Sequence, residues 1–249
     1  MKNRGLSQES LKLIACVTML IDHIGATLVL RMLQSMPLQN RAFVLGVYYG
    51  LRIIGRIAFP IYCFLLVEGT YHTRNPKKYG LRLLIGVLLS EIPFDLAFSL
   101  RGRVFFDWSS NSVMLTLLLG FCMIEAMKRW TGFRKVAVIL PFYLLAEWLQ
   151  TDYGGLGILI IAVFALTRGL PREKLYQCLG LCLVVYPGQR SFLGSVAVNL
   201  EWFAVLALIP IFCYSGRKLT HNKMAQWAFY LFYPVHIALL ALLEVLIFG

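Results

Sequence analysis

Charged side chains are scarce in this sequence. Asp, Glu, Lys and Arg make up 14% of the 249 residues, whereas an average soluble domain carries about 25%. Hydrophobic residues account for 59%, and the mean hydropathy is +0.72. This balance excludes an ordinary soluble domain and indicates a chain that faces lipid.

Sequence motifs for several common chemistries are absent as well. There is no P-loop, no GxGxxG and no GxSxG, so nothing indicates nucleotide hydrolysis or an esterase with a nucleophile elbow. Cys178 and Cys182 lie one helical turn apart, but no second pair of metal-ligating residues accompanies them. We therefore predict no metal site and interpret the cysteines as small buried hydrophobic side chains.

Acidic residues are half as numerous as basic residues, 12 against 24, and the net charge is +12. A positive charge can indicate nucleic-acid binding, which requires a solvated basic face. Here the basic residues form short clusters between apolar runs, as they do in the loops of membrane proteins. We therefore predict the lipid bilayer, and no nucleic acid, as a partner.

Apolar runs near the length of about 20 residues that crosses a bilayer recur along the chain. They predict an all-α fold, a polytopic integral membrane helical bundle of about nine transmembrane helices, in a single domain over residues 1–249. The expected spans are Leu11–Leu33, Tyr48–Thr70, Tyr79–Leu100, Val113–Met127, Val136–Gln150, Gly155–Leu166, Leu175–Tyr186, Phe192–Tyr214 and Trp227–Phe248.

The basic clusters predict the orientation of these spans. They precede the first span and follow the second, fourth, sixth and eighth, whereas the other loops carry few basic residues. Because Lys and Arg are enriched on the cytoplasmic side, we expect a cytoplasmic N-terminus and a C-terminus outside. The clusters are Lys2, Arg4 and Lys12; Arg74, Lys77, Lys78 and Arg82; Lys128, Arg129, Arg134 and Lys135; Arg168, Arg172 and Lys174; and Arg217, Lys218 and Lys223.

Several ionisable residues lie inside the expected spans, where a charge costs about 2.5–3.5 kcal/mol. With a rise of about 1.5 Å per residue, His23 lies about 16 Å from Lys12 and therefore near the midplane. The others fall at a similar depth or slightly further outward. Structural pairs need not share a depth, so we predict a polar cavity formed by Asp22, His23, Arg56, Glu91, Asp95, Glu147, Glu201 and His236.

His23 is the chemically most useful member of this layer, because an imidazole can take and return a proton near neutral pH. A carboxylate could fix its tautomer, and Asp22, Glu91 and Glu201 are alternatives for this role. His236 follows Tyr233 and Pro234. It belongs either to the same site or to a structural hydrogen bond between helices.

The loop after the second expected span is the strongest polar cluster. It contains Glu68, His72, Arg74, Lys77 and Lys78. One interpretation is a cytoplasmic anchor of the kind found in any such protein. The other is an anion site, which would suit a phosphate-bearing cosubstrate such as coenzyme A.

A series of ordered motifs in the chain resembles the TraX family of bacterial membrane proteins. The motifs extend from the first expected span to the last and keep their order. They are Leu11–Ala15, Met19–Gly25, Ile54–Pro60, Glu68–Gly69 with His72–Asn75, Arg82–Leu84, Ile92–Phe94, Leu115–Gly120, Tyr153–Gly155 and Phe232–His236.

The resemblance implies transfer of an acetyl group from acetyl-CoA to an amine or a hydroxyl, in the bacterial cytoplasmic (inner) membrane. The family is named for a protein that N-acetylates pilin, so the acceptor would be a protein N-terminus such as that of pilin, or an envelope glycan. The family is also distantly similar to the membrane acyltransferases of family 3. These share a basic residue followed by ten residues and a His, and Lys12 and His23 have this spacing.

The resemblance also implies roles for individual residues. His23 would act as the general base, oriented by Asp22, Glu91 or Glu201, and Arg56 or a backbone amide would stabilise the oxyanion. The acyl-CoA donor would be held by Lys12, Arg74, Lys77, Lys78 and Arg82. The substrate or the catalytic groups would be supported by Glu68, His72, Asp95, Glu147, Glu201, Tyr233 and His236.

Two other functions are compatible with the composition. A transporter could use the ionisable layer to bind a substrate, but secondary transporters usually show paired repeats, and none is visible here. A non-enzymatic assembly factor would not require ionisable groups at one depth.

Overall fold

A computed structural model describes residues 5–98, 111–186, 190–193, 196–219 and 223–248. The chain divides into two compact units. The first consists of Met1–Ile61, Leu96–Phe98 and Gly188–Gly249, and the second of Tyr62–Asp95 and Ser99–Pro187. The single domain predicted from the sequence stays a prediction.

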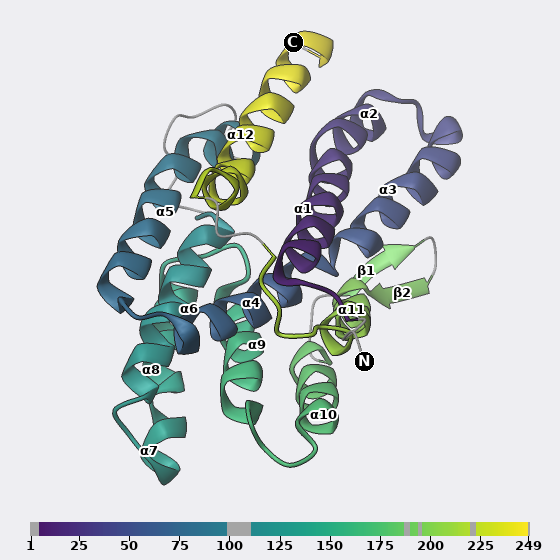
Figure 1. The fold of residues 1–249 in the computed structure, drawn as a ribbon. Coiled ribbons are helices and arrows are strands. Elements are labelled where there is room, and N and C mark those ends of the chain that lie inside the picture. Colours follow the sequence, from purple (N-terminus) through teal and green to yellow (C-terminus); the bar gives the residue numbers. More distant parts are fainter. Residues whose placement is uncertain (1–4, 99–110, 187–189, 194–195, 220–222, 249) are drawn as a thin grey trace. The chain divides into compact units, whose positions relative to one another are not determined.

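The first unit begins with a long helical segment. A side-chain cap starts α1, because Ser7 Oγ accepts a hydrogen bond from the backbone N–H of Ser10 at 3.1 Å. Leu11, Ala15 and Met19 recur every four residues along one buried face. The segment consists of α1 (Gln8–Ile24), the π-helical turn η1 (Gly25–Val29) and α2 (Leu30–Ser35), and Figure 1 shows α1 and α2 following one another.

A break at Arg56 and Ile57 divides the expected second span into two helices. A short 3₁₀ turn, η2 (Leu38–Asn40), precedes α3 (Arg41–Gly55), and α4 runs over Ala58–His72. Pro60 explains the break, because a proline lacks the N–H that would bond the carbonyl four residues earlier, and its ring clashes with that carbonyl. In this chain that carbonyl belongs to Arg56.

The same arrangement recurs at Pro141 in the expected fifth span. The helix is interrupted at Val138, between α7 (Gly132–Ala137) and α8 (Ile139–Trp148). The carbonyl four residues before Pro141 belongs to Ala137, at the end of α7. In contrast, Pro93 and Pro234 lie within continuous helices.

The predicted eighth span, Phe192–Tyr214, is wrong in its first part. Strands β1 (Arg190–Leu193) and β2 (Val196–Asn199) pair antiparallel there, with Leu193 opposite Val196. β-branched residues such as Val196 and Val198 favour strands over helices. Helix begins only after this hairpin, as the 3₁₀ segment η3 (Leu200–Ala207) and then α11 (Leu208–Phe212).

The first and last helices of the first unit begin side by side. Leu6 N–H donates to the carbonyl of Cys213 at 2.7 Å, and Ser215 N–H donates to the carbonyl of Leu6 at 2.9 Å. Just beyond this parallel contact, α1 and α12 (Lys223–Phe248) begin. If both helices cross a bilayer, an even number of crossings separates these paired segments. One further crossing by α12 then places the two ends of the chain on opposite sides.

In the second unit, the buried helix α9 packs against helices on several sides. Gly120 of α6 lies against Ile161, Gly155 of α9 lies against the ring of Tyr143 of α8, and Gly180 of α10 faces Val163. These glycines let the helices approach closely, because each lacks the Cβ that would collide with its neighbour. The helices of this unit are the remainder of α4, α5 (Pro76–Phe98) up to Asp95, α6 (Val113–Met127), α7, α8, α9 (Gly154–Thr167) and α10 (Glu173–Val185).

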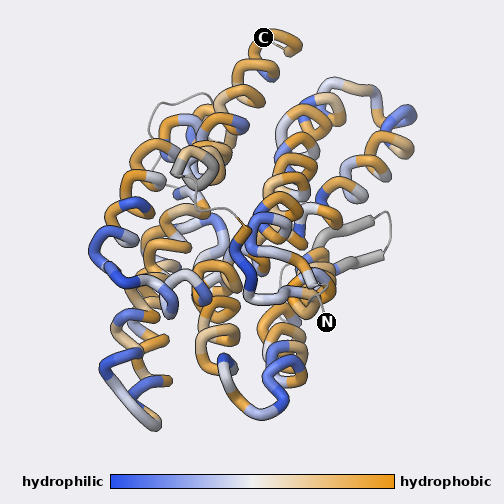
Figure 2. Tube along the Cα trace, in the orientation of Figure 1, coloured by the Kyte–Doolittle hydropathy of each residue, from blue (hydrophilic) through white to orange (hydrophobic). Residues whose placement is uncertain are grey.

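Apolar residues dominate most of these helices, and hydrophilic residues gather near their ends and in loops (Figure 2). By length and composition, three described segments are suited to cross a membrane: Gln8–Ser35, Leu38–His72 and Trp227–Phe248. Shorter apolar helices occur at Val113–Met127, Gly154–Thr167 and Leu200–Phe212. The helical fold predicted from the sequence is confirmed apart from the hairpin, whereas the count of nine spans stays a prediction.

We predict that Gly120→Ala lowers the stability of the protein. The added methyl group would overlap Cδ1 of Ile161, which is fully buried. Overpacking of this kind costs about 2 kcal/mol, or about 5 °C in melting temperature for a chain of this size. Gly46→Ala is the matched control, because nothing lies within 4 Å of the added atom. Equal melting temperatures of the two variants in detergent would contradict the packing described for α9.

The parallel start of α1 and α12 predicts the sidedness of the last helix. Alkaline phosphatase is active only outside the cytoplasm, so it should be active when fused after Phe248 and inactive when fused after Arg217. Enzyme assays on cells that express the two fusions measure this directly. Similar activity of both fusions would show that α12 does not separate two sides of a membrane.

Candidate functional site

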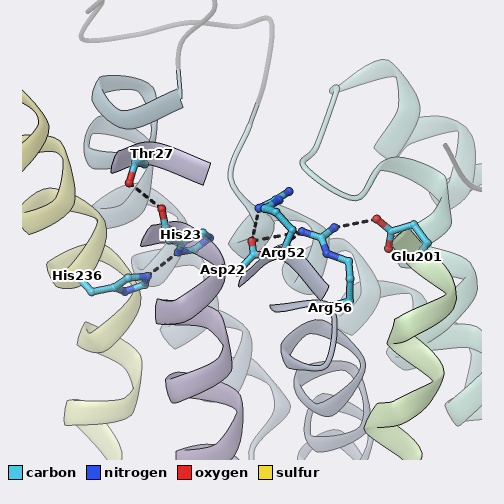
Figure 3. Close-up of polar contacts among 7 residues, drawn as sticks. All are labelled: Asp22, His23, Thr27, Arg52, Arg56, Glu201 and His236. Atoms are coloured by element: carbon cyan, nitrogen blue, oxygen red, sulfur yellow. Dashed lines mark hydrogen bonds and ion pairs between the residues drawn. The ribbon is translucent and has the colours of Figure 1, made fainter. Parts of the chain in front are cut away.

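The candidate site surrounds Asp22 and His23, in the last turn of α1. The chain then widens into the π-helical turn η1, in which Thr27 Oγ1 donates to the carbonyl of His23 at 2.7 Å. Such turns are frequent at functional sites. Adjacent residues on a helix point about 100° apart. In Figure 3, accordingly, Asp22 extends toward Arg52 of α3 and toward Arg56, which directly follows α3. His23 extends toward α12.

Two glycines bring α1 and α3 close together at this point. A Cβ at Gly25 would lie 3.0 Å from Leu51 Cβ, and a Cβ at Gly55 would overlap the Asp22 carboxylate. The Asp22 side chain therefore occupies the space that a larger residue at position 55 would fill. This close packing fixes the carboxylate against α3.

Asp22 accepts hydrogen bonds from two guanidinium groups. Arg52 Nη1 lies 2.5 Å from Asp22 Oδ2, and Arg56 Nη2 lies 3.0 Å from Asp22 Oδ1. Arg56 Nη1 also donates to Glu201 Oε1 at 2.8 Å. Two cations and two anions thus form a chain that balances its own charge (Figure 3).

The two arginines differ in how many of their nitrogens bind carboxylates. Both terminal nitrogens of Arg56 bind carboxylates, and the residue is only 8% exposed. Arg52 uses Nη1 alone for Asp22, and its Nε and Nη2 have no hydrogen-bond partner among the described residues. Arg52 is therefore better suited than Arg56 to bind a further oxygen atom.

His23 contacts a second histidine rather than a carboxylate. Its Nδ1 lies 2.6 Å from Nε2 of His236 on α12, and the two rings are nearly coplanar, with an interplanar angle of 10° and their centroids 4.9 Å apart. His236 Nδ1 lies 2.6 Å from the carbonyl oxygen of Phe232. The rings of Tyr233 and Phe98 also lie near His23, at centroid distances of 6.0 and 5.5 Å.

Two more polar contacts join the same helices. The ammonium group of Lys12 lies 5.3 Å from the ring centroid of Phe229. Arg31 Nε lies 2.5 Å from Glu244 Oε1, and Glu244 is buried. The contacts to α12 therefore follow the order of residues along α1 and α2, which shows that the helices run in parallel.

The remaining acidic residues of the expected layer lie in the second unit. Glu91 accepts hydrogen bonds from Ser112 Oγ at 2.7 Å and from Ser112 N–H at 3.2 Å. Glu147 accepts from the N–H of Gly155 at 2.7 Å. Asp95 is buried. The contacts of Glu91 and Glu147 connect segments within this unit.

Glu68 and His72 belong to a charged cluster of the second unit. Arg168 Nε donates to Glu68 Oε1 at 2.7 Å, and His72 Nδ1 lies 3.6 Å from Glu68 Oε2. The guanidinium of Arg168 and the ammonium of Lys128 lie 4.7 and 5.0 Å from the ring centroid of Tyr71. This cluster joins the ends of α4, α6 and α9.

The predicted coenzyme-binding residues of the second unit surround the start of α5. Asn75 Oδ1 accepts a hydrogen bond from Lys78 N–H at 2.9 Å and so caps this helix. Arg74, Lys77 and Lys78 are exposed, and the guanidinium of Arg82 lies 5.5 Å from the ring centroid of Tyr79. Exposed cations at a helix N-terminus suit phosphate groups.

Arg52 is the site residue that the sequence prediction missed. It lies one helical turn before Arg56, and this i, i+4 spacing of two arginines at the end of α3 could have identified it. The depth of His23 and His236 predicted a shared polar layer, but the sequence contains no signal that these two histidines, 213 residues apart, contact each other directly. No group of three or more His, Cys, Asp and Glu side chains suited to a metal ion occurs among the described residues.

Asp22→Asn should destabilise the protein more than Glu201→Gln does. The first change removes the anion shared by Arg52 and Arg56, whereas the second leaves Arg56 paired with Asp22. Breaking a buried pair costs about 3–5 kcal/mol. Thermal unfolding in detergent measures the difference, and addition of Arg52→Gln should restore part of the loss in Asp22→Asn. Equal melting temperatures for Asp22→Asn and the wild type would show that the shared anion contributes no stability.

The comparisons with known proteins agree on one family. A probable fimbrial assembly protein FimC, serogroup H1, of Dichelobacter nodosus is 31% identical to this chain, and the alignment covers 96% of each chain. Protein TraX of Escherichia coli is 24% identical over 95% of this chain and 86% of its own. An uncharacterized protein of Rickettsia prowazekii (strain Madrid E) is 27% identical over 89% of this chain and 75% of its own.

No solved structure matches the chain. The family model described as TraX protein matches residues 7–244. This match includes every residue of the candidate site and nearly the whole sequence. The protein therefore belongs to the TraX family.

Proposed function

We propose that this protein is a multi-pass acyltransferase of the bacterial inner membrane that transfers an acetyl group from acetyl-CoA to an amine or hydroxyl acceptor. The observation that carries the proposal is the arrangement around Asp22. His23, whose Nε2 has no hydrogen-bond partner among the described residues, directly follows the aspartate that binds Arg52, and Arg52 Nε and Nη2 have no partner within the same part of the chain. A base and an oxyanion donor are the two groups that direct acyl transfer requires.

His23 acts as the general base in this proposal. Its Nδ1 is bonded to His236, and its Nε2 has no hydrogen-bond partner among the described residues. The nitrogen or oxygen of the acceptor attacks the thioester carbonyl carbon, and its proton moves to His23 Nε2. The carbon–sulfur bond then breaks, and the CoA thiolate takes the proton from His23, so that the products are the acetylated acceptor and free CoA.

Arg52 replaces Arg56 as the residue that binds the developing oxyanion. The Nε and Nη2 groups of Arg52 have no partner in the described part of the chain, whereas Glu201 and Asp22 occupy both terminal nitrogens of Arg56. Asp22 holds Arg52 in place, and Arg56 and Glu201 hold Asp22. Fixed donors of this kind stabilise a transition state without reorganising during the reaction.

The phosphates of the donor have two candidate sites. Lys12 lies on the same helical segment as His23, about 16 Å away along the axis. An extended cofactor arm could follow this helix. Arg74, Lys77 and Lys78, at the capped start of α5, form the other candidate. Separate neutralisation of the two sets, with the KM for acetyl-CoA as the readout, distinguishes them.

The name of one relative bears on the chemical class of the acceptor. The Dichelobacter nodosus relative is named as a probable fimbrial assembly protein, which favours the N-terminal amine of a pilus subunit over an envelope glycan. The same name also supports a second candidate function, a membrane assembly factor without enzymatic activity. Only the acyltransferase would release CoA.

We expect purified protein to release CoA from acetyl-CoA when a suitable acceptor is present. His23→Ala should slow this release about 100-fold, because a general base contributes at least that factor. Arg52→Gln should slow it about 100-fold through loss of an oxyanion donor. A thiol reagent measures free CoA, and Arg129→Gln, which changes an exposed arginine after α6, is the control.

Two results would contradict this function. Acceptor-dependent release at the wild-type rate in His23→Ala would exclude His23 as the base. Failure of the wild type both to release CoA from acetyl-CoA and to bind it in calorimetry would exclude the donor and favour the assembly factor.

A further inference from the structure

We propose that His236 is a positioning residue that fixes the proton of His23 on Nδ1 and thereby presents Nε2 as the base. This inference rests on the proposed function only because it assigns Nε2 the role of the base. The arrangement of protons itself follows from three atoms on α12 and one on α1. Figure 3 shows His236 extending from α12 toward His23.

The carbonyl of Phe232 determines where the first proton lies. A carbonyl oxygen only accepts hydrogen bonds, so His236 Nδ1, 2.6 Å away, must be the donor. In a neutral imidazole the other nitrogen then accepts. His236 Nε2 is thus an acceptor, and it faces His23 Nδ1 at 2.6 Å.

The second proton follows from the first. Because His236 Nε2 accepts, His23 Nδ1 must donate to it, and the lone pair of neutral His23 lies on Nε2. The backbone of α12 therefore sets the tautomer of His23 through the ring of His236. This tautomer leaves Nε2 available to the acceptor.

The His236 ring is held in one orientation. It lies nearly coplanar with the His23 ring, at an interplanar angle of 10° and a centroid distance of 4.9 Å, so the two nitrogens meet edge to edge. The ring of Phe232 lies beside it at a centroid distance of 4.8 Å and an angle of 22°. The residue is only 5% exposed. Rotation of the ring would break both of its hydrogen bonds.

No carboxylate of the first unit's described residues competes for His23 Nδ1. Asp22 binds Arg52 and Arg56, and Glu201 binds Arg56. The rings of Tyr233 of α12 and Phe98 of α5 also border His23, and the charges of Arg52 and Arg56 act on it. His236 thus occupies the position at which hydrolases with a catalytic triad place an aspartate.

The contact strengthens during the reaction. When His23 Nε2 takes the acceptor proton, the ring becomes a cation, and its Nδ1–H bond to His236 becomes charge-assisted. The proton on His23 Nδ1 and the proton on His236 Nδ1 keep their positions. His236 therefore stabilises the cationic form of His23 in addition to orienting it.

The test compares His236→Gln with His236→Leu. A glutamine side-chain oxygen can accept the Nδ1–H bond of His23, whereas leucine cannot. We expect His236→Leu to lower kcat about 100-fold, at the low end of what a general base contributes. The KM for acetyl-CoA should change little, and His236→Gln should retain activity within about tenfold of the wild type.

An NMR measurement reports the tautomer of His23 independently of enzymatic activity. In protein with ¹⁵N-labelled histidine, the ring nitrogens of His23, assigned by comparison with His23→Gln, should show a protonated Nδ1 and an unprotonated Nε2. His236→Gln should keep this pattern, and His236→Leu should lose it. If the wild type showed the opposite tautomer, or if His236→Leu kept both the pattern and kcat, the inference would be wrong. If the pattern were present in a protein without CoA release, the proposed function would fail and the positioning role would stand.

Discussion

Asp22 accepts hydrogen bonds from Arg52 and Arg56, and the rest of the candidate site depends on this contact. The carboxylate lies against Gly55, where no Cβ would fit. An arginine buried among apolar helices is tolerated only with an anion beside it. The pair therefore brings α1 and the end of α3 together, and the direction of Asp22 leaves its neighbour His23 facing α12.

The break at Arg56 and Ile57 shows how a backbone constraint serves the same contact. Pro60 cannot donate a helical hydrogen bond to the carbonyl of Arg56, and α3 ends at Gly55. Arg56 thus lies at the end of α3, bonded to Asp22 on one side and to Glu201 on the other. The hairpin before η3 places Glu201 in the first turn of a 3₁₀ segment, where Asn199 accepts a hydrogen bond from its backbone N–H.

Much of this fold could be predicted from the sequence, because long apolar runs have few alternatives to helix. Val113–Met127 has the same bounds in the prediction and in the structure. The predicted span Phe192–Tyr214 missed strands β1 and β2 because hydropathy does not distinguish a short apolar strand from the start of a span. At the site, His23 was a prediction from depth and resemblance. Its partner His236 depends on the parallel packing of two helices 213 residues apart, which no local pattern records.

In the proposed function, acyl transfer takes place between His23 Nε2 and the nitrogens of Arg52 that have no partner among the described residues. A structure of the protein with a stable ketone analogue of acetyl-CoA, in which a methylene group replaces the thioester sulfur, tests it most directly. The account predicts the ketone oxygen within hydrogen-bond distance of Arg52 and the carbonyl carbon facing a space bordered by His23 Nε2. An analogue bound with its ketone away from both residues would contradict it.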